Sequence, residues 1–230
     1  MDQPFGQLSM KKLIGIVAAC SLMSAASAGP VNTERKSEFE KVFGVVFASA
    51  LPRMSDLQRD ALVRDYIDAK PNKGQAINAL AGVSYRSTDH EDYEATGERT
   101  LEACQLRFGS PCALVAINES IVDDARLIPK DMPRLHYSGE FDLTKIPIIR
   151  SITKSRLDLQ SYSKAEGQKA IAVHPWGTLF IAFRSNSRDA QDAALAACNA
   201  DPRRKSRDGN CFVYAVNNQV VVSERRQIGK

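Results

Sequence analysis

Four cysteines form two closely spaced pairs in this 230-residue sequence, Cys104 with Cys112 and Cys198 with Cys211. Paired cysteines can bind zinc, exchange electrons or form disulfides. Neither pair has the short spacing of zinc ribbons, and neither is the C-x-x-C of thioredoxin-like redox proteins. We therefore expect structural disulfides, provided that the chain reaches an oxidising compartment, and no metal or cofactor.

Other residues with catalytic potential do not form a recognisable pattern. His90, His136 and His174 are too far apart for their spacing to indicate a ligand set. Residues 89–92, Asp-His-Glu-Asp, could bind a divalent cation, but they precede a predicted helix, where carboxylates favour the N-terminal dipole. None of the common nucleophile, metalloprotease or phosphate-loop motifs occurs. The sequence favours a non-catalytic role, although a site assembled from distant residues would leave no such signal.

Four residues of the second half are candidates for binding a partner: Trp176, Arg203, Arg204 and Tyr214. Trp176 is the single tryptophan and lies in an expected turn, where an exposed ring could anchor a partner. Arg203 and Arg204 begin a basic run that could touch lipid headgroups, a polysaccharide or an acidic protein. The simpler alternatives are a tryptophan packed on its own sheet and a solvated loop.

The N-terminus has the pattern of a secretory signal peptide, predicted as residues 1–28. Lys11 and Lys12 precede an apolar run, Leu13 to Met23, and Ala26-Ser27-Ala28 supplies the small residues of a cleavage site. The run is shorter than the roughly 20 residues that span a bilayer, so no transmembrane segment is expected. A lipid anchor at Cys20 is the less favoured alternative. We expect a periplasmic or secreted protein.

Two segments of the chain resemble each other closely. CALVAINESIV, residues 112–122, aligns without a gap with CFVYAVNNQVV, residues 211–221. Earlier matches follow at offsets near 95, which indicates an internal duplication. The paired residues are Leu101–Cys104 with Leu195–Cys198, Tyr85–Ser87 with Phe183–Ser185, Ala76-Ile77 with Ala170-Ile171, and Tyr66 with Tyr162.

Each copy is predicted to fold as helix, strand, strand, helix, strand, which makes an α+β module with a small antiparallel sheet. An additional amphipathic helix is expected over 34–51. The predicted organisation is an N-terminal helix plus first copy over 29–122, a connection over 123–146 and a second copy over 147–230. In copy one we expect strands over 76–81 and 83–86 and a helix over 94–106, and in copy two strands over 170–173 and 178–183 and a helix over 188–200.

The four cysteines allow three pairings, and the duplication favours the same local bond in each copy. Cys104–Cys112 and Cys198–Cys211 would each tie the end of a helix to the start of a strand. Loops this short should yield about 2–4 kcal/mol of stability per bond. Pairing between the copies remains open.

The second half resembles the C-terminal module of a loosely defined group of exported bacterial proteins of unknown function. Its pattern is a tyrosine, then Lys-Ala-x-Ala, Ala-Leu-x-x-Cys-Asn and Cys-x-x-Tyr-Ala-Val-Asn-x-x-Val-Val. Here these are Tyr162, residues 169–172, 194–199 and 211–221. The first copy lacks Lys-Ala-x-Ala and has Val115 where the second has Tyr214, so a binding role of this tyrosine would belong to the second copy.

Together these patterns predict an exported, non-catalytic binding or interaction protein, an inhibitor or an envelope-associated factor being special cases. Its partner would be a protein or an anionic envelope polymer, whereas nucleic acid is not expected in that compartment. The alternative is an envelope hydrolase whose site is assembled between the copies. Convergence of a histidine, a carboxylate and a hydroxyl in one cleft would favour the hydrolase.

We predict that the exported protein begins at Gly29, because Ala26-Ser27-Ala28 is the site that a signal peptidase reads. Mass spectrometry of the protein purified from the envelope measures this N-terminus directly. A mature chain that begins at an acylated Cys20 would contradict it.

Overall fold

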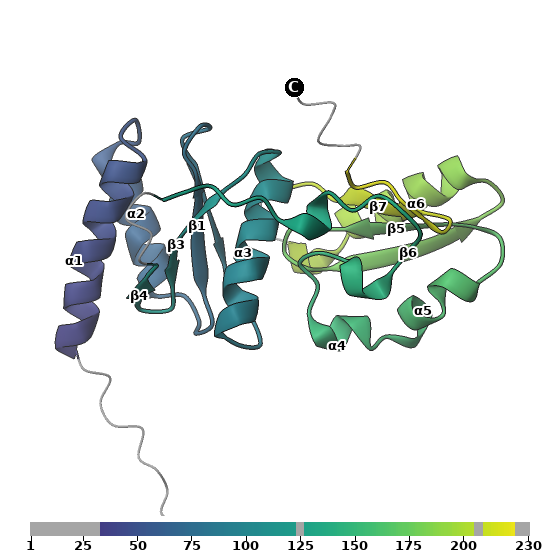
Figure 1. Cartoon of the computed structure of the whole chain (residues 1–230), viewed down its shortest axis with the longest axis horizontal. Coiled ribbons are helices and arrows are strands. Elements are labelled where there is room, and N and C mark those ends of the chain that lie inside the picture. The colour runs from purple at the N-terminus through teal and green to yellow at the C-terminus, as the bar shows by residue number, and fades with distance from the viewer. Residues whose placement is uncertain (1–32, 123–126, 205–208, 224–230) are drawn as a thin grey trace, which may run out of the picture. The chain divides into compact units, whose positions relative to one another are not determined.

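The computed structural model describes residues 33–122, 127–204 and 209–223 (Figure 1). The predicted signal peptide and Cys20 lie outside these ranges. Among the described residues, no helix has the length and apolar character needed to cross a membrane.

The fold class is confirmed as α+β, with two four-stranded antiparallel sheets of the same strand order. The first sheet has the order β2-β1-β3-β4, and the second has the order β6-β5-β7-β8. Each copy ends in a two-residue strand that the sequence did not predict. The first part contains α1 (Thr33–Ala50), α2 (Asp56–Ile67), β1 (Gly74–Asn78), β2 (Val83–Ser87), α3 (Tyr93–Phe108), β3 (Ala113–Ile117) and β4 (Ser120–Ile121).

The second copy departs from the predicted element order at its start. In place of one helix like α2 it has two single-turn helices and a 3₁₀ turn. The elements are α4 (Ser151–Lys154), α5 (Leu157–Gln160), η3 (Tyr162–Lys164), β5 (Gln168–Val173), β6 (Leu179–Arg184), α6 (Ser187–Asn199), η4 (Pro202–Arg204), β7 (Phe212–Val216) and β8 (Gln219–Val220). The connection between the copies contains η1 (Pro133–Leu135) and η2 (Leu143–Lys145).

Side-chain caps fix where the longer helices begin. Ser55 and Gln58 form a capping box at the start of α2, and the carboxylate of Asp92 accepts from the backbone N–H of Ala95 at the start of α3. The cap of α6 is Asn186, whose side-chain oxygen accepts from the backbone N–H of Asp189. Helix α3 ends at Gly109, whose φ of 75° favours glycine.

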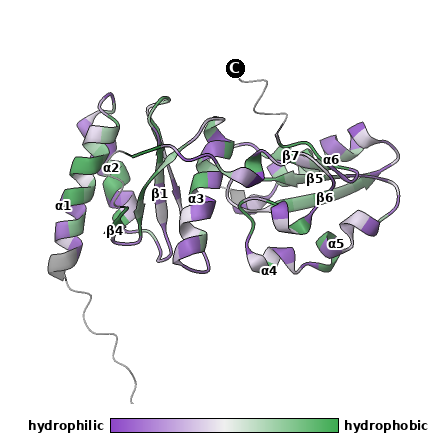
Figure 2. Cartoon of the chain, viewed as in Figure 1, coloured by the Kyte–Doolittle hydropathy of each residue, from purple (hydrophilic) through white to green (hydrophobic). Residues whose placement is uncertain are grey.

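The first sheet is packed between helices on both faces. Glycines let α3 approach one face, since a Cβ at Gly74 would lie 2.2 Å from Thr100 Oγ1. On the other face, Phe43 and Tyr66 of α1 and α2 pack against Ile77 and Val115. Both α1 and α3 alternate hydrophobic and hydrophilic residues along their length (Figure 2), as expected for helices with one buried side.

In the second copy a helix of small residues lies on the sheet. Ala190, Ala194 and Cys198 of α6 are fully buried against Ala170 and Ala172 of β5. The opposite face belongs to the largest buried cluster, which also holds Leu101 of the first copy and Leu135 and Ile146 of the connection. The connection is therefore part of the core.

Both predicted disulfides are present. The Sγ atoms of Cys104 and Cys112 are 1.99 Å apart, and those of Cys198 and Cys211 are 1.97 Å apart. Each bond joins the last turns of a helix to the residue at the start of the next strand, so the loop between them can differ in length while the strand stays in register.

The strand pairing corrects the alignment of the two copies. Gly74 pairs with Ile117 at the position in its sheet where Ala170 pairs with Val216 in the other sheet. In both sheets the register shifts between the next two residues, which are 75 and 76 in β1 and 171 and 172 in β5. Ala76 therefore corresponds to Ala172, and the predicted match of Ala76-Ile77 with Ala170-Ile171 is wrong by two residues. By the same pairing Tyr85 corresponds to Phe180 and not to Phe183.

In this corrected alignment each copy contains the same buried lysine. Lys73 and Lys169 are 2% and 3% exposed, and their Nζ atoms lie 5.0 Å and 4.9 Å from the ring centroids of Tyr66 and Tyr162. Both ammonium groups donate to backbone carbonyls at the end of the preceding helical segment. The lysine of the Lys-Ala-x-Ala pattern thus has a counterpart in the first copy, which the sequence comparison missed.

We predict that Lys169→Met lowers the free energy of unfolding by about 2–3 kcal/mol, because the carbonyls of Tyr162 and Ala165 lose a charged donor in a buried place. Lys164→Met is the matched control, since Lys164 is exposed and should change stability by less than about 0.5 kcal/mol. Urea unfolding of both variants measures the difference. Equal losses would contradict the role of Lys169.

Candidate functional site

A cavity of about 330 Å³ lies between the two copies and is lined by four arginines. We call it the arginine pocket. Arg99 comes from α3 of the first copy, whereas the other three come from the second. Its lining consists of Arg99, Arg150, Arg156, Arg203, Ser87, Thr88, Asp89, His90, Ala103, Ile148, Thr153, Pro175, Trp176, Gly177, Thr178 and Leu179.

Each of the four guanidinium groups has a carboxylate partner that holds it in place. The carboxylates neutralise much of the local charge, and they reduce the freedom of long side chains that would otherwise be mobile. The pairs are Arg99 with Glu91, Arg150 with Asp89 at 3.4 Å, Arg156 with Asp158 at 2.6 Å, and Arg203 with Asp201 at 3.0 Å.

Arg99 is the most buried of the four, at 7% exposure. Its Nη2 donates to Glu91, while its Nη1 is buried and has no hydrogen-bond partner among the described residues. Glu91 also accepts from the backbone N–H of Ser151 at 2.7 Å. Burial opposes ionisation of Glu91, but the bonds from Arg99 and Ser151 outweigh it and hold the pKa of this carboxyl below its usual range.

Two further buried polar atoms of the pocket lack a partner within the described ranges. They are Thr178 Oγ1 and Nδ1 of His90. A buried polar atom without a partner costs stability unless something else satisfies it. A donor of Arg99, a hydroxyl and an imidazole nitrogen in one cavity therefore suit a ligand rich in oxygen.

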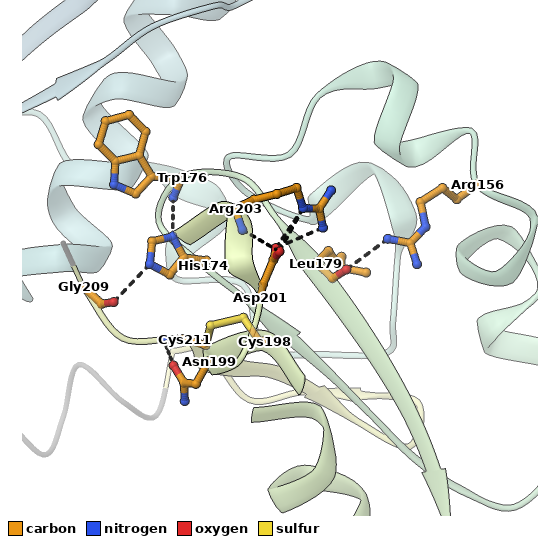
Figure 3. Close-up of a disulfide and its surroundings, with 10 residues drawn as sticks. All are labelled: Arg156, His174, Trp176, Leu179, Cys198, Asn199, Asp201, Arg203, Gly209 and Cys211. Carbon is orange, nitrogen blue, oxygen red and sulfur yellow. Dashed lines mark hydrogen bonds and ion pairs between the residues drawn. A yellow bond between two sulfur atoms is a disulfide. The ribbon is translucent and has the colours of Figure 1, made fainter. Parts of the chain in front are cut away.

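The second disulfide and His174 position the turn that forms one wall (Figure 3). His174 is fully buried; its Nδ1 accepts from the backbone N–H of Trp176 at 3.1 Å, so Nε2 carries the proton and donates to the carbonyl of Gly209 at 3.0 Å. Asp201 accepts from the backbone N–H and the Nε of Arg203, both at 3.0 Å. The cysteine loop and the β5–β6 turn thereby hold Trp176 and Arg203 at the same cavity.

The structure brings together two of the four residues predicted to bind a partner. Trp176 is half-buried and its ring centroid lies 5.8 Å from that of Tyr85, while the side chain of Arg203 is 67% exposed. Tyr214 is fully buried in the core, so its position gives no support to a surface role. The side chain of Arg204 lies outside the described part of the chain.

Sequence reasoning missed Arg99, Arg150 and Arg156, because no fixed spacing relates them. One signal was available for Arg99. It shares helical spacing with Thr96 and Ala103, both buried in α3. An arginine on the inward side of a helix is rarely tolerated without partners.

The acidic residues among 89–92 make contacts within the chain. Asp89 and Glu91 pair with arginines, and Asp92 caps α3. In the described ranges, no group of three or more histidine, cysteine, aspartate or glutamate side chains could hold a metal ion.

Comparison of the chain with models of protein families, with curated proteins and with solved structures found no match in any of the three. The resemblance to exported bacterial modules therefore stays a prediction.

We predict that His90 makes the protein less stable as the pH falls from about 6.5 to about 4. Burial, and then the positive charge of Arg99, lower the pKa of His90 to about 4. An unfolded histidine titrates near 6.5, so between these values the unfolded chain binds more protons and stability decreases with acidity. His90→Gln should flatten the slope of unfolding free energy against pH between about 6.5 and 5, measured by urea unfolding.

Arg188→Gln is the control for this measurement, because Arg188 is an exposed residue of α6 outside the pocket lining. It should leave the slope as in the unsubstituted protein. Parallel slopes for all three proteins would show that His90 is not held neutral.

Proposed function

We propose that this chain is an exported, non-catalytic binding protein whose ligand carries a negative charge and binds in the arginine pocket. The observation that carries the proposal is Arg99, a buried arginine that lines the cavity and whose Nη1 has no hydrogen-bond partner among the described residues. Export is supported by the signal-like N-terminus and by the two disulfides.

Carboxylate, phosphate and sulfate groups fit this donor arrangement. Their oxygens accept charge-assisted hydrogen bonds from the planar guanidinium fork, which is the strongest neutralising contact that Arg99 can make. A volume of about 330 Å³ is at the lower end of small-ligand pockets, about 300–1,000 Å³. The pocket therefore suits one acidic group or the acidic end of a longer molecule.

Hydrolysis is the second candidate, because one contact in the same pocket favours it. Ser87 Oγ and His90 Nε2 are 2.8 Å apart, and Asp89 lines the cavity beside them. Against it, Ser87 is 5% exposed, and the Nδ1 of His90 lacks, among described residues, the acceptor that orients the base in a catalytic triad. We rank binding above hydrolysis for these two reasons.

The test uses Trp176, whose fluorescence reports from the pocket wall because it is the single tryptophan. The probes are citrate, inorganic phosphate, sulfate and galacturonate. Arg99→Met should weaken binding of the tightest probe by about tenfold or more, since a charge-assisted contact contributes about 1.5–3 kcal/mol. Arg203→Glu changes an exposed side chain and should be tolerated by the fold. It should weaken binding of the same probe more than Arg99→Met does, because it adds a repelling negative charge.

Arg188→Met is the matched control, because Arg188 is an exposed residue of α6 outside the pocket lining. It should bind the probe like the unsubstituted protein. If Arg99→Met and Arg203→Glu both bind the probe as tightly as the unsubstituted protein does, the proposal is overturned. Release of nitrophenol from nitrophenyl esters that is lost in Ser87→Ala would favour the hydrolase.

A further inference from the structure

A second cavity, of about 500 Å³, shares Trp176 with the arginine pocket. We call it the aromatic pocket, because Tyr85, Phe108 and Trp176 form much of its wall. Its remaining lining consists of Met54, Leu62, Asp65, Gln75, Val83, Ser84, Arg86 and Arg107.

Strand β2 runs along both cavities. Four of its five residues, Val83 to Arg86, line the aromatic pocket, while the fifth, Ser87, and the next residue, Thr88, line the arginine pocket. The two cavities therefore follow one another along the direction of this strand.

The strand is also the edge of its sheet. Among the described strands β2 pairs with β1 alone. An edge strand presents a row of backbone N–H and C=O groups on its outer side, which is a template for an added strand. A ligand with its own backbone donors and acceptors would suit this row.

The lining of the aromatic pocket includes a hydrogen-bond donor on the face of the sheet opposite Tyr85. Gln75 of β1 is 2% exposed, lies opposite Arg86 in the strand pairing and lines the cavity. Its Nε2 is buried and has no hydrogen-bond partner in the described part of the chain. An occupant made of hydrocarbon alone would leave this amide unsatisfied, so the occupant should bring an acceptor such as a carbonyl.

We propose that an extended peptide with an acidic end binds along the outer edge of β2 as an added strand. Its carboxylate lies in the arginine pocket, and an apolar or aromatic side chain lies among Tyr85, Phe108 and Trp176. This inference rests on the proposed function for the arginine pocket and adds the class of ligand. A peptide is favoured over an acidic saccharide because the row of strand backbone groups matches another strand in spacing.

The length of the peptide follows from strand geometry. A strand advances by about 3.3 Å per residue, so about five or six residues reach from the aromatic pocket to the arginine pocket. Side chains alternate between the two faces of a strand, so every second residue of the peptide would face the aromatic side chains.

The test uses a library of fluorescein-labelled hexapeptides with amidated C-termini that end in Asp or, as a matched set, in Asn, with Val, Tyr, Phe and Ser at the other positions. Fluorescence anisotropy should select Asp peptides with an aromatic residue, about tenfold tighter than their Asn counterparts. N-methylation at alternate residues should weaken the best peptide by at least about tenfold, while methylation of the residues between should change little.

Two variants of the full chain separate the pockets. Gln75→Leu, which keeps the volume and removes the amide, should weaken the peptide by about threefold to tenfold and leave binding of citrate unchanged. Arg99→Met should weaken both. Phe183→Ala is the control, because Phe183 is an exposed ring outside both linings, and it should weaken neither.

Other outcomes are decisive against the inference. Citrate or phosphate binding without any peptide binding would overturn the added strand and leave the proposed function intact. Peptide binding that every N-methylation weakens equally, or none weakens, would also overturn it. Oligogalacturonate that binds tighter than every peptide and depends on Gln75 would assign the groove to a saccharide, and no binding of any probe would overturn both proposals.

Discussion

The buried carboxylate of Glu102 is the interaction on which the geometry of the site depends. Glu102 is fully buried in α3; it accepts from the Nε of Arg134 at 2.6 Å and from the backbone N–H of Ile148 at 2.7 Å. Burial raises the pKa of Glu102, and Arg134 opposes the shift. A buried charge that loses such partners costs several kcal/mol, so α3 is held against the segment leading to Arg150. Arg99 lies one helical turn earlier and is positioned with it.

The two copies share one contact between the turn that joins their first two strands and the loop before their second cysteine, and they differ in the loop residues that line the pocket. Asn78 accepts from the N–H of Ala81 in the β1–β2 turn and donates to Ser110, two residues before Cys112. His174 makes the equivalent contacts in the second copy, to Trp176 and to Gly209, two residues before Cys211. In both copies one side chain therefore joins the turn to the cysteine loop. Because this contact is shared by the two copies, Trp176 and Arg203 differ from the first copy in the loops and not in the underlying sheet and helix.

Sequence reasoning succeeded where a local pattern decides the structure and failed where distant segments meet. The cysteine spacing and the duplication predicted both disulfides, and the helix expected over 188–200 is α6. The lysine counterpart Lys73 was missed because the dipeptides Ala76-Ile77 and Ala170-Ile171 are identical in sequence but lie two residues apart in the equivalent strands, and only the pairing partners reveal this offset. Arg150 and Arg156 were missed because two copies must pack together before these side chains and Arg99 share a cavity.

The carboxylates behind the arginines change what the pocket can select. Four arginines alone would attract any anion through their field, and salt would screen that attraction. Here Glu91, Asp89, Asp158 and Asp201 offset the charge, so under the proposed function the unused N–H groups would select a ligand by direction more than by net charge. A donor such as Nη1 of Arg99 is already oriented before a ligand arrives, and little side-chain freedom is then lost on binding. Such a site can discriminate between acidic groups of equal charge by the placement of their oxygens, which a mobile basic loop could not do.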